Sequence, residues 1–198
     1  MASLNLLPEP AFAELKSLLN ERLERMAASL RPEQFSSLLD PVMQQVLEEG
    51  FTQARADEGT LWLIDAEGEN LVPAFNNGPN AERFVGEFRQ PLNAGLICMV
   101  FSTEQPFIEN EVDKNANQSR LLDTRLQVKT HALIAVPFYF LQRCRGVASC
   151  VQLKPANRGN PAGFGPKDLE TVQLTANVLG RLLEHRLLGK AVDWEGSS

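Results

Sequence analysis

The sequence predicts an α+β protein, in which helices flank a central, mainly antiparallel sheet of about six strands. Short β-branched and aromatic runs return on themselves across Gly- and Asn-containing turns, which is typical of hairpins. Helical stretches with apolar stripes stand before and after these runs. With 198 residues, of which 43% are hydrophobic, the chain can bury a core without disulfides or metal ions.

Two helical stretches are expected before the sheet, over residues 9–30 and 32–55. In the first, apolar residues recur three or four apart, which places them on one face. These residues are Phe12, Leu15, Leu19, Leu23, Met26 and Leu30. Pro32 ends the first stretch, and the Asp40-Pro41 pair indicates that the second is broken by a new helix start.

The sheet is expected to begin with a hairpin whose turn, residues 65–68, uses Gly68 for a positive φ angle. A second, longer hairpin should turn at residues 142–145, and short helices are expected over 93–101 and 115–125. The expected strands span residues 60–64, 69–75, 87–92, 106–109, 130–141 and 146–153.

A long helix should close the fold, with Pro166 in its first turn, Asp168 near the positive end of its dipole and Gly189 at its end. Its apolar stripe comprises Leu169, Val172, Ala176, Leu179, Leu183 and Leu187. We therefore divide the chain into an N-terminal packing or dimerisation helix (1–31), a compact domain (32–189) and a disordered tail (190–198).

Charge and hydropathy exclude several classes of function. The formal net charge is −6 and no cluster of Lys and Arg occurs, which argues against a nucleic-acid partner. We find neither a signal peptide nor an apolar run long enough to cross a bilayer, so we expect a cytoplasmic protein without a membrane partner.

The chain has three cysteines and two histidines, at spacings that fit neither a disulfide framework nor a zinc site. We therefore expect reduced thiols, no bound metal and no cofactor.

Five sequence segments, in the same order and spacing, resemble the GAF domain, a small-molecule-binding regulatory module. They are residues 58–65, 91–96, 129–137, 146–153 and 164–169. The resemblance spans roughly residues 35–187 and carries the fold more strongly than any one function, because one fold hosts many activities. It implies a ligand-sensing protein rather than an enzyme.

A longer motif partly resembles the GAF domains of cyclic-nucleotide phosphodiesterases. Asn157, Phe164 and Asp168 match it, Arg158 stands where that motif has Lys, and Glu170 comes one place late. The resemblance implies a cyclic nucleotide as one possible ligand, and we expect Arg158 to pair with Asp168.

In GAF domains the ligand lies between one sheet face and short covering segments, here residues 95–101 and 115–130, which we call the lid. Phenylalanines would supply an apolar floor, and Arg120 or Arg125 would contact a phosphate. The candidate ligand-binding residues are Phe75, Phe88, Cys98, Phe101, Asn117, Arg120, Thr124 and Thr130.

Two alternatives stay open. A GAF-fold thiol enzyme similar to the free methionine-(R)-sulfoxide reductases needs a nucleophilic cysteine on the strand that here reads residues 131–135, where none occurs, although Cys98 lies near another thiol of that family. A scaffold would fill the pocket with its own side chains. No Ser-His-Asp set, phosphate loop or Cys-His pair for bilin attachment is apparent.

The apolar stripes of the first and last helices are longer than the sheet can cover. We expect these helices to pack together, and two copies to form a homodimer through them. A ligand-dependent helix arrangement would then pass the signal to a downstream protein partner.

Overall fold

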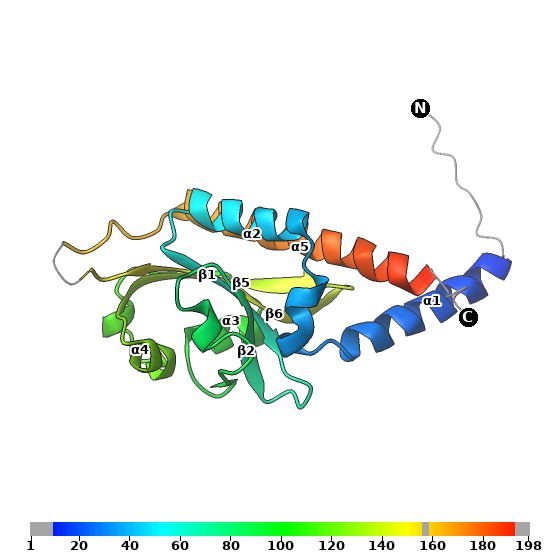
Figure 1. Ribbon diagram of the computed structural model, residues 1–198, viewed down its shortest axis with the longest axis horizontal. Coiled ribbons are helices and arrows are strands. Elements are labelled where there is room, and N and C mark those ends of the chain that lie inside the picture. Colours follow the sequence, from blue (N-terminus) through cyan, green and yellow to red (C-terminus); the bar gives the residue numbers. More distant parts are fainter. Residues whose placement is uncertain (1–9, 156–158, 193–198) are drawn as a thin grey trace.

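The computed structural model describes residues 10–155 and 159–192. Its six strands form one antiparallel sheet in the order β3-β2-β1-β6-β5-β4. Helices α2 and α5 cover one face of this sheet, and the short helices α3 and α4 lie on the other (Figure 1). The predicted α+β class and the number of strands are therefore confirmed.

Three helical elements precede the sheet: α1 (Pro10–Ala28), a 3-10 helix (Pro32–Leu38) and α2 (Pro41–Gln53). The predicted break at Asp40 is confirmed, because its Oδ1 accepts the N–H of Met43 at 2.9 Å and so caps α2.

The centre of the sheet is β1 (Glu58–Ile64), which pairs with β2 (Asn70–Asn76) and with β6 (Arg143–Leu153). The remaining strands are β3 (Gln90–Pro91), β4 (Phe107–Glu109) and β5 (Thr130–Phe140). A Cβ added to Gly146 would stand 1.9 Å from the carbonyl oxygen of Trp62, so the close approach of β6 to β1 requires glycine.

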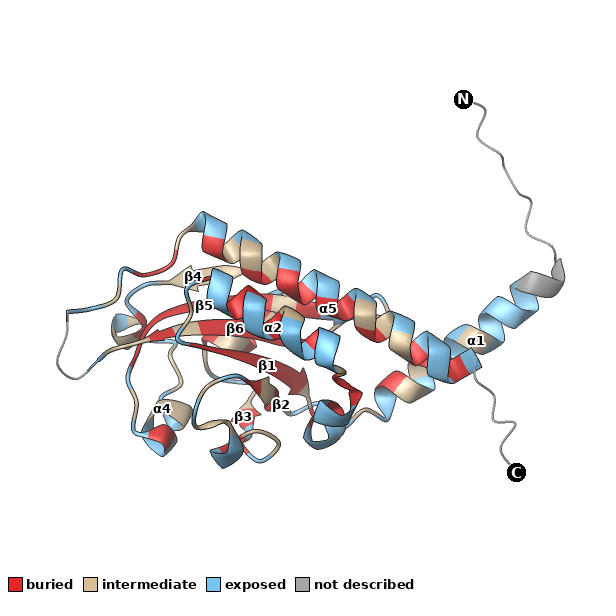
Figure 2. Cartoon of the chain, turned by 45° about the horizontal axis from the view of Figure 1, so that its top comes forward, coloured by how far each residue is buried: buried red, intermediate tan, exposed pale blue. Residues whose placement is uncertain are grey.

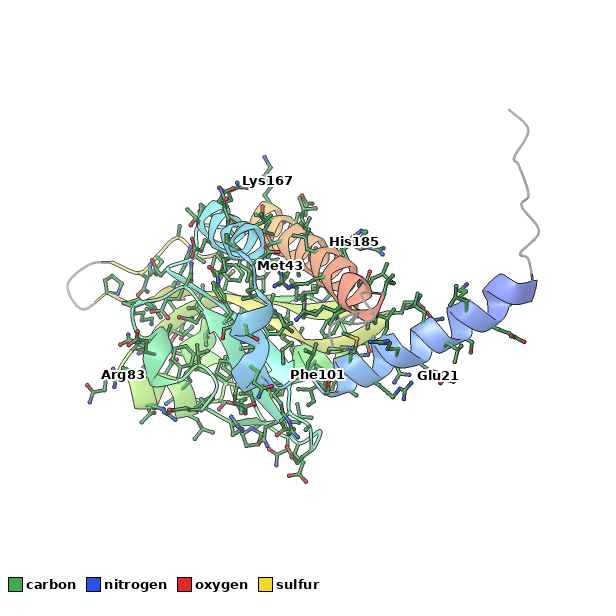
Figure 3. The ribbon with its side chains drawn as sticks, turned by 45° about the vertical axis from the view of Figure 1, so that its right-hand side comes forward. Glu21, Met43, Arg83, Phe101, Lys167 and His185 are labelled. Atoms are coloured by element: carbon green, nitrogen blue, oxygen red, sulfur yellow. The ribbon has the colours of Figure 1, made fainter. Side chains whose placement is uncertain are left out.

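Each face of the sheet buries its own core. On one face, Leu61, Ile134 and Phe138 pack beneath α2 and α5 (Pro166–Val192), and this cluster is the helical core. On the other face, Trp62 and Val147 pack beneath α3 (Leu96–Thr103) and α4 (Leu121–Leu126), and this cluster is the lid core. Figure 2 shows the buried strands between the two layers. Figure 3 shows Met43 in the helical layer and Arg83 in the opposite one.

The predicted packing of the long terminal helices together is confirmed over the C-terminal half of α1. Leu23 and Ala27 are buried there in the helical core, which also takes in Leu183 and Leu187 of α5. Leu15, on the predicted stripe, is 58% exposed because α1 projects beyond the sheet (Figure 1). The side chain of Phe12 lies outside the described residues.

Several predicted boundaries were wrong. The long hairpin turns at Leu141 and Gln142, both at positive φ, and Arg143 already belongs to β6. Gly189 does not end α5, which continues to Val192. Residues 190–192, which were predicted to belong to the disordered tail, are therefore helical. The rest of the predicted tail, residues 193–198, lies outside the described residues.

Among the described helices, none is long and apolar enough to cross a bilayer. The described residues also contain no group of three or more His, Cys, Asp or Glu side chains that could hold a metal ion.

Candidate functional site

A cavity of about 100 Å³ lies between the sheet and the lid. Side chains from alternate positions of two adjacent strands form its floor: Glu58, Thr60 and Trp62 from β1, and Ser149 and Val151 from β6. Because side chains alternate along a strand and Thr60 is paired with Ser149, these residues share one face of the sheet.

Trp62 is fixed as a wall of this cavity by two contacts. Its Nε1 donates a hydrogen bond to Ser149 Oγ at 2.9 Å. Its ring meets that of Phe88 edge-on, with centroids 6.2 Å apart and an interplanar angle of 71°. The buried indole N–H is thereby satisfied without a ligand.

The α3 side of the lid is held by backbone conformation and by one buried amide. Gly95 precedes α3 with a φ of 98°, and a Cβ there would come within 3.1 Å of Ser119 Cβ. Gln90 is buried, lines the cavity and donates through Nε2 to the carbonyl of Ala94 at 2.9 Å. The start of α3 is thus tied to the sheet edge beside the cavity.

The α4 side of the lid is tied to the sheet through Asp123. This carboxylate accepts the backbone N–H of Thr130 at 2.9 Å and its hydroxyl at 2.8 Å. Gln118 Nε2 also donates to Asp123 Oδ2, at 3.4 Å, whereas Gln118 Oε1 is buried without a partner among the described residues. One acceptor in the wall of the cavity is therefore left unpaired.

The charged residues that line the cavity are both acidic: Glu58 and Asp123, with no Lys, Arg or His among the described lining residues. Burial raises the pKa of Glu58, and the side-chain amide of Asn76 partly opposes this rise. The electrostatics of the cavity therefore disfavour an anion.

The predicted ligand-binding residues divide into groups. Thr130 lines the cavity, whereas Phe88, Phe101 and Cys98 belong to the lid core and do not line it. Phe75 packs against the helical core on the other face, because it is paired with Leu61, whose side chain belongs to that core.

The predicted polar residues of the lid lie further out. Arg120 and Thr124 line an outer cleft of about 370 Å³, which shares Asp123 and Thr130 with the cavity. Asn117 is exposed. Arg125 was expected to contact a ligand phosphate. Its Nη2 instead donates to the carbonyl oxygen of Arg83 at 2.7 Å and to Glu87 Oε2 at 3.2 Å, on the surface, so the structure does not support this role.

The predicted pair of Asp168 with Arg158 lies outside the described residues, and the structure shows another cation beside Asp168. Asp168 pairs with Arg55, which follows α2, and accepts the N–H of Gly165 at 2.7 Å. Phe164 is buried in the helical core, whereas Asn157 and Arg158 lie outside the described residues. Phe164 and Asp168 are not among the described residues that line the cavity.

Sequence reasoning missed the sheet residues of the cavity, chiefly Glu58, Thr60, Gln90 and Ser149. Strand alternation places Thr60 and Trp62 on one face of their strand. Which face of β1 lies beneath the lid depends on how β1 pairs with β6. The local sequence does not reveal this pairing.

The three cysteines lie away from the cavity lining. Cys98 is buried in the lid core, where burial raises its pKa to about 11. Cys150 is buried in the helical core, and desolvation raises its pKa further. Burial also raises the pKa of the half-buried Cys144. At neutral pH these groups are thiols, not thiolates.

Comparison with known proteins agrees with this geometry. The family model of the GAF domain matches residues 38–183. A search of curated protein sequences gives no match. The GAF domain of a phosphoenolpyruvate-protein phosphotransferase from Coxiella burnetii superposes with a TM-score of 0.60 at 19% identity, over 92% of this chain and 99% of that one.

Two other solved structures have the same fold. A fragment of a methyl-accepting chemotaxis protein matches with a TM-score of 0.61 at 16% identity, over 88% of this chain and 99% of that one. Free methionine-R-sulfoxide reductase from Neisseria meningitidis matches with a TM-score of 0.51 at 17% identity, over 97% and 100% of the two chains. At these identities the likeness concerns the fold alone.

Proposed function

This chain belongs to the GAF domain family, and we propose that it is a regulatory module that senses a small molecule and is not an enzyme. The observation that carries the proposal is the cavity beneath the lid, which has polar side chains on its walls. The chemotaxis protein among the structural neighbours supports a regulatory role.

The size of the cavity limits the ligand. Its volume of about 100 Å³ is below the ~300–1,000 Å³ usual for drug-sized ligands. A cyclic nucleotide is larger than this cavity, and its phosphate would meet the carboxylates of Glu58 and Asp123 with no cation among the described residues that line the cavity. These features favour a smaller ligand.

The thiols argue against the sulfoxide-reductase alternative. Such chemistry begins with a thiolate within reach of the substrate. Cys98 has a pKa raised to about 11, is buried within the lid core and does not line the cavity. The scaffold alternative is disfavoured because the side chains beneath the lid leave a cavity.

The route to the output runs through the β5–β6 turn to both terminal helices. Leu141 donates its N–H to Glu184 Oε1 of α5 at 2.8 Å. Arg145 binds Glu24 Oε2 of α1, also at 2.8 Å. β6 carries both Arg145 and the cavity residue Ser149, so a ligand that shifts β6 would bias the two helices.

A homodimer formed through the terminal helices would cover apolar side chains that are exposed on these helices in the single chain. Leu174, Val178, Leu188 and Val192 lie on one stripe of α5 and are exposed in the single chain. Leu15 and Leu18 of α1 are exposed as well. A downstream protein partner would then detect the changed helix arrangement.

Native mass spectrometry of protein purified from its own host tests the proposal. We expect a retained small molecule and a particle of two chains, each of 22.0 kDa. A Thr60→Leu variant, which fills the cavity, should lose the small molecule, whereas Ser37→Ala, at an exposed position of the 3-10 helix, should keep it. Titration with cAMP and cGMP, followed by Trp62 fluorescence, tests the nucleotide alternative.

A protein that retains no small molecule, and whose Thr60→Leu variant dimerises and melts as the wild type does, would support the scaffold and overturn sensing. Reduction of methionine sulfoxide by the purified protein would overturn the non-enzymatic assignment.

A further inference from the structure

We propose that the cavity beneath the lid binds a small organic cation, a protonated amine whose N–H groups donate to the wall. This inference rests on the proposed function, because it names the ligand class of the same cavity.

The first argument is the charge of the wall. Glu58 is only 8% exposed, lines the cavity and is not part of any ion pair found among the described residues. A buried carboxylate without a cation is costly, because desolvation is not repaid by an opposite charge. An ammonium group in the cavity would offset this desolvation cost by its attraction to the Glu58 carboxylate, whereas an anion would be repelled by that carboxylate.

The second argument is the orientation of Gln118. Its Nε2 faces the carboxylate of Asp123, which fixes the amide, because the reversed amide would bring two oxygens together. Gln118 Oε1 is then a buried acceptor that lacks a donor in the described structure. A ligand N–H would supply that donor, which an ether or a carboxylate ligand cannot do.

The third argument is the aromatic wall. Trp62 and Phe84 both line the cavity, and the Trp62 N–H is already bonded to Ser149. The indole thus has no donor left for a ligand, and a ligand can contact only the atoms of its rings. Organic cations are attracted to the faces of aromatic rings, most strongly to Trp.

The fourth argument is size. A volume of about 100 Å³ is the room of a few water molecules, at about 30 Å³ per molecule in the liquid. The ligand is therefore a compact amine of a few heavy atoms. With so few atoms, binding weaker than micromolar is expected.

Three probes of similar size separate the charge classes: propylammonium and propan-1-ol, with four heavy atoms each, and propionate, with five. Isothermal titration calorimetry on the full chain, with Trp62 fluorescence as a second signal, should show propylammonium binding at least tenfold more tightly than propan-1-ol. Propionate should give no saturable binding.

Two variants test the assignment of the wall. Glu58→Gln keeps the side-chain shape and should weaken propylammonium binding at least tenfold while leaving propan-1-ol unchanged. Gln118→Leu removes the unpaired acceptor and should also weaken the amine. The matched control is Glu67→Gln, on the exposed β1–β2 turn, which should bind as the wild type does. Circular dichroism establishes that each variant is folded.

Binding of propan-1-ol or propionate as tightly as propylammonium would overturn the cation assignment and leave small-molecule sensing intact. An unchanged amine affinity in folded Glu58→Gln would overturn it as well. If none of the three probes binds, the cation assignment fails, and native mass spectrometry then decides separately whether the cavity retains another molecule.

Discussion

Arg55 and Asp168 join the end of α2 to the first turn of α5 across the helical layer. Arg55 Nε donates to Asp168 Oδ1 at 3.0 Å, and its Nη2 donates to Oδ2. The same carboxylate accepts the N–H of Gly165, which stands just before α5. One buried side chain therefore both caps α5 and ties it to α2, which holds together the layer above the helical core.

Replacing Asp168 with Asn should lower the free energy of unfolding at pH 7 by about 2 kcal/mol, because hydrogen bonds to a charged group are lost. Arg55 lowers the pKa of Asp168 below its ordinary value. A carboxyl group with a lowered pKa stabilises the fold above its unfolded-state pKa of about 3.9, and this contribution is lost as the pH falls further. Urea unfolding from pH 3 to 8 measures the difference between wild type and variant.

That difference should be constant from pH 5 to 8 and shrink below pH 4. Glu170→Gln, an exposed change on the same helix, is the control and should unfold as the wild type does. A difference that persists undiminished to pH 3 would show that the charge of Asp168 is not what stabilises this contact.

Two glycines should respond to alanine in opposite directions. At Gly146 a Cβ would stand 1.9 Å from the Trp62 carbonyl oxygen, and this backbone atom cannot move without separating β1 from β6. At Gly189, inside α5, nothing lies within 4 Å. We expect Gly146→Ala to lower the melting temperature severely and Gly189→Ala to stabilise the protein by ~0.5–1 kcal/mol. Thermal unfolding followed by circular dichroism checks both, and a Gly146→Ala protein of wild-type stability would contradict the pairing of β1 with β6.

Ser149→Ala should cost ~1–3 kcal/mol of unfolding free energy, because it leaves the indole N–H of Trp62 without its partner. The emission of Trp62 should change with it, since the hydrogen bond to Ser149 is lost. Ser37→Ala, which removes an exposed hydroxyl, is the matched control and should change neither. Denaturant unfolding and fluorescence spectra give the two readings, and an unchanged stability would mean that water replaces the hydroxyl.

Local signals in the sequence were sufficient for much of the fold. The Asp40-Pro41 pair marked a helix start because its chemistry acts within one turn, and Asp40 does cap α2. Interactions between distant segments left no such signal. Arg55 and Asp168 are 113 residues apart, and nothing beside Arg55 indicates its partner.

The site was harder to predict than the fold for the same reason. The floor of the cavity is formed by two adjacent strands, β1 and β6. The pairing of these strands decides which of their side chains face the lid. Thr60 and Ser149 therefore come together only because β1 lies beside β6. Aromatic residues were a misleading guide. Phe75 and Phe88 were expected to share one pocket, yet they belong to cores on opposite faces of the sheet.

The proposed homodimer predicts that a charge on the exposed stripe of α5 separates the two chains. Leu174 and Val192 are 64% and 63% exposed in the single chain, and five helical turns place them on the same side of α5. Glutamate at either position costs the isolated fold little, since the side chain already meets solvent. In the proposed dimer, however, it would bury a carboxylate in the interface with the second chain. In Leu174→Glu the sedimenting particle should therefore change from two chains to a single chain of 22.0 kDa, and the variant should still melt cooperatively as a folded protein.

The control is Lys190→Glu, at an exposed position on the opposite side of the helix, and this variant should stay dimeric. A wild-type protein that sediments as one chain at tens of micromolar would remove the dimer from the proposal, and the signal would then have to leave α5 through a different protein.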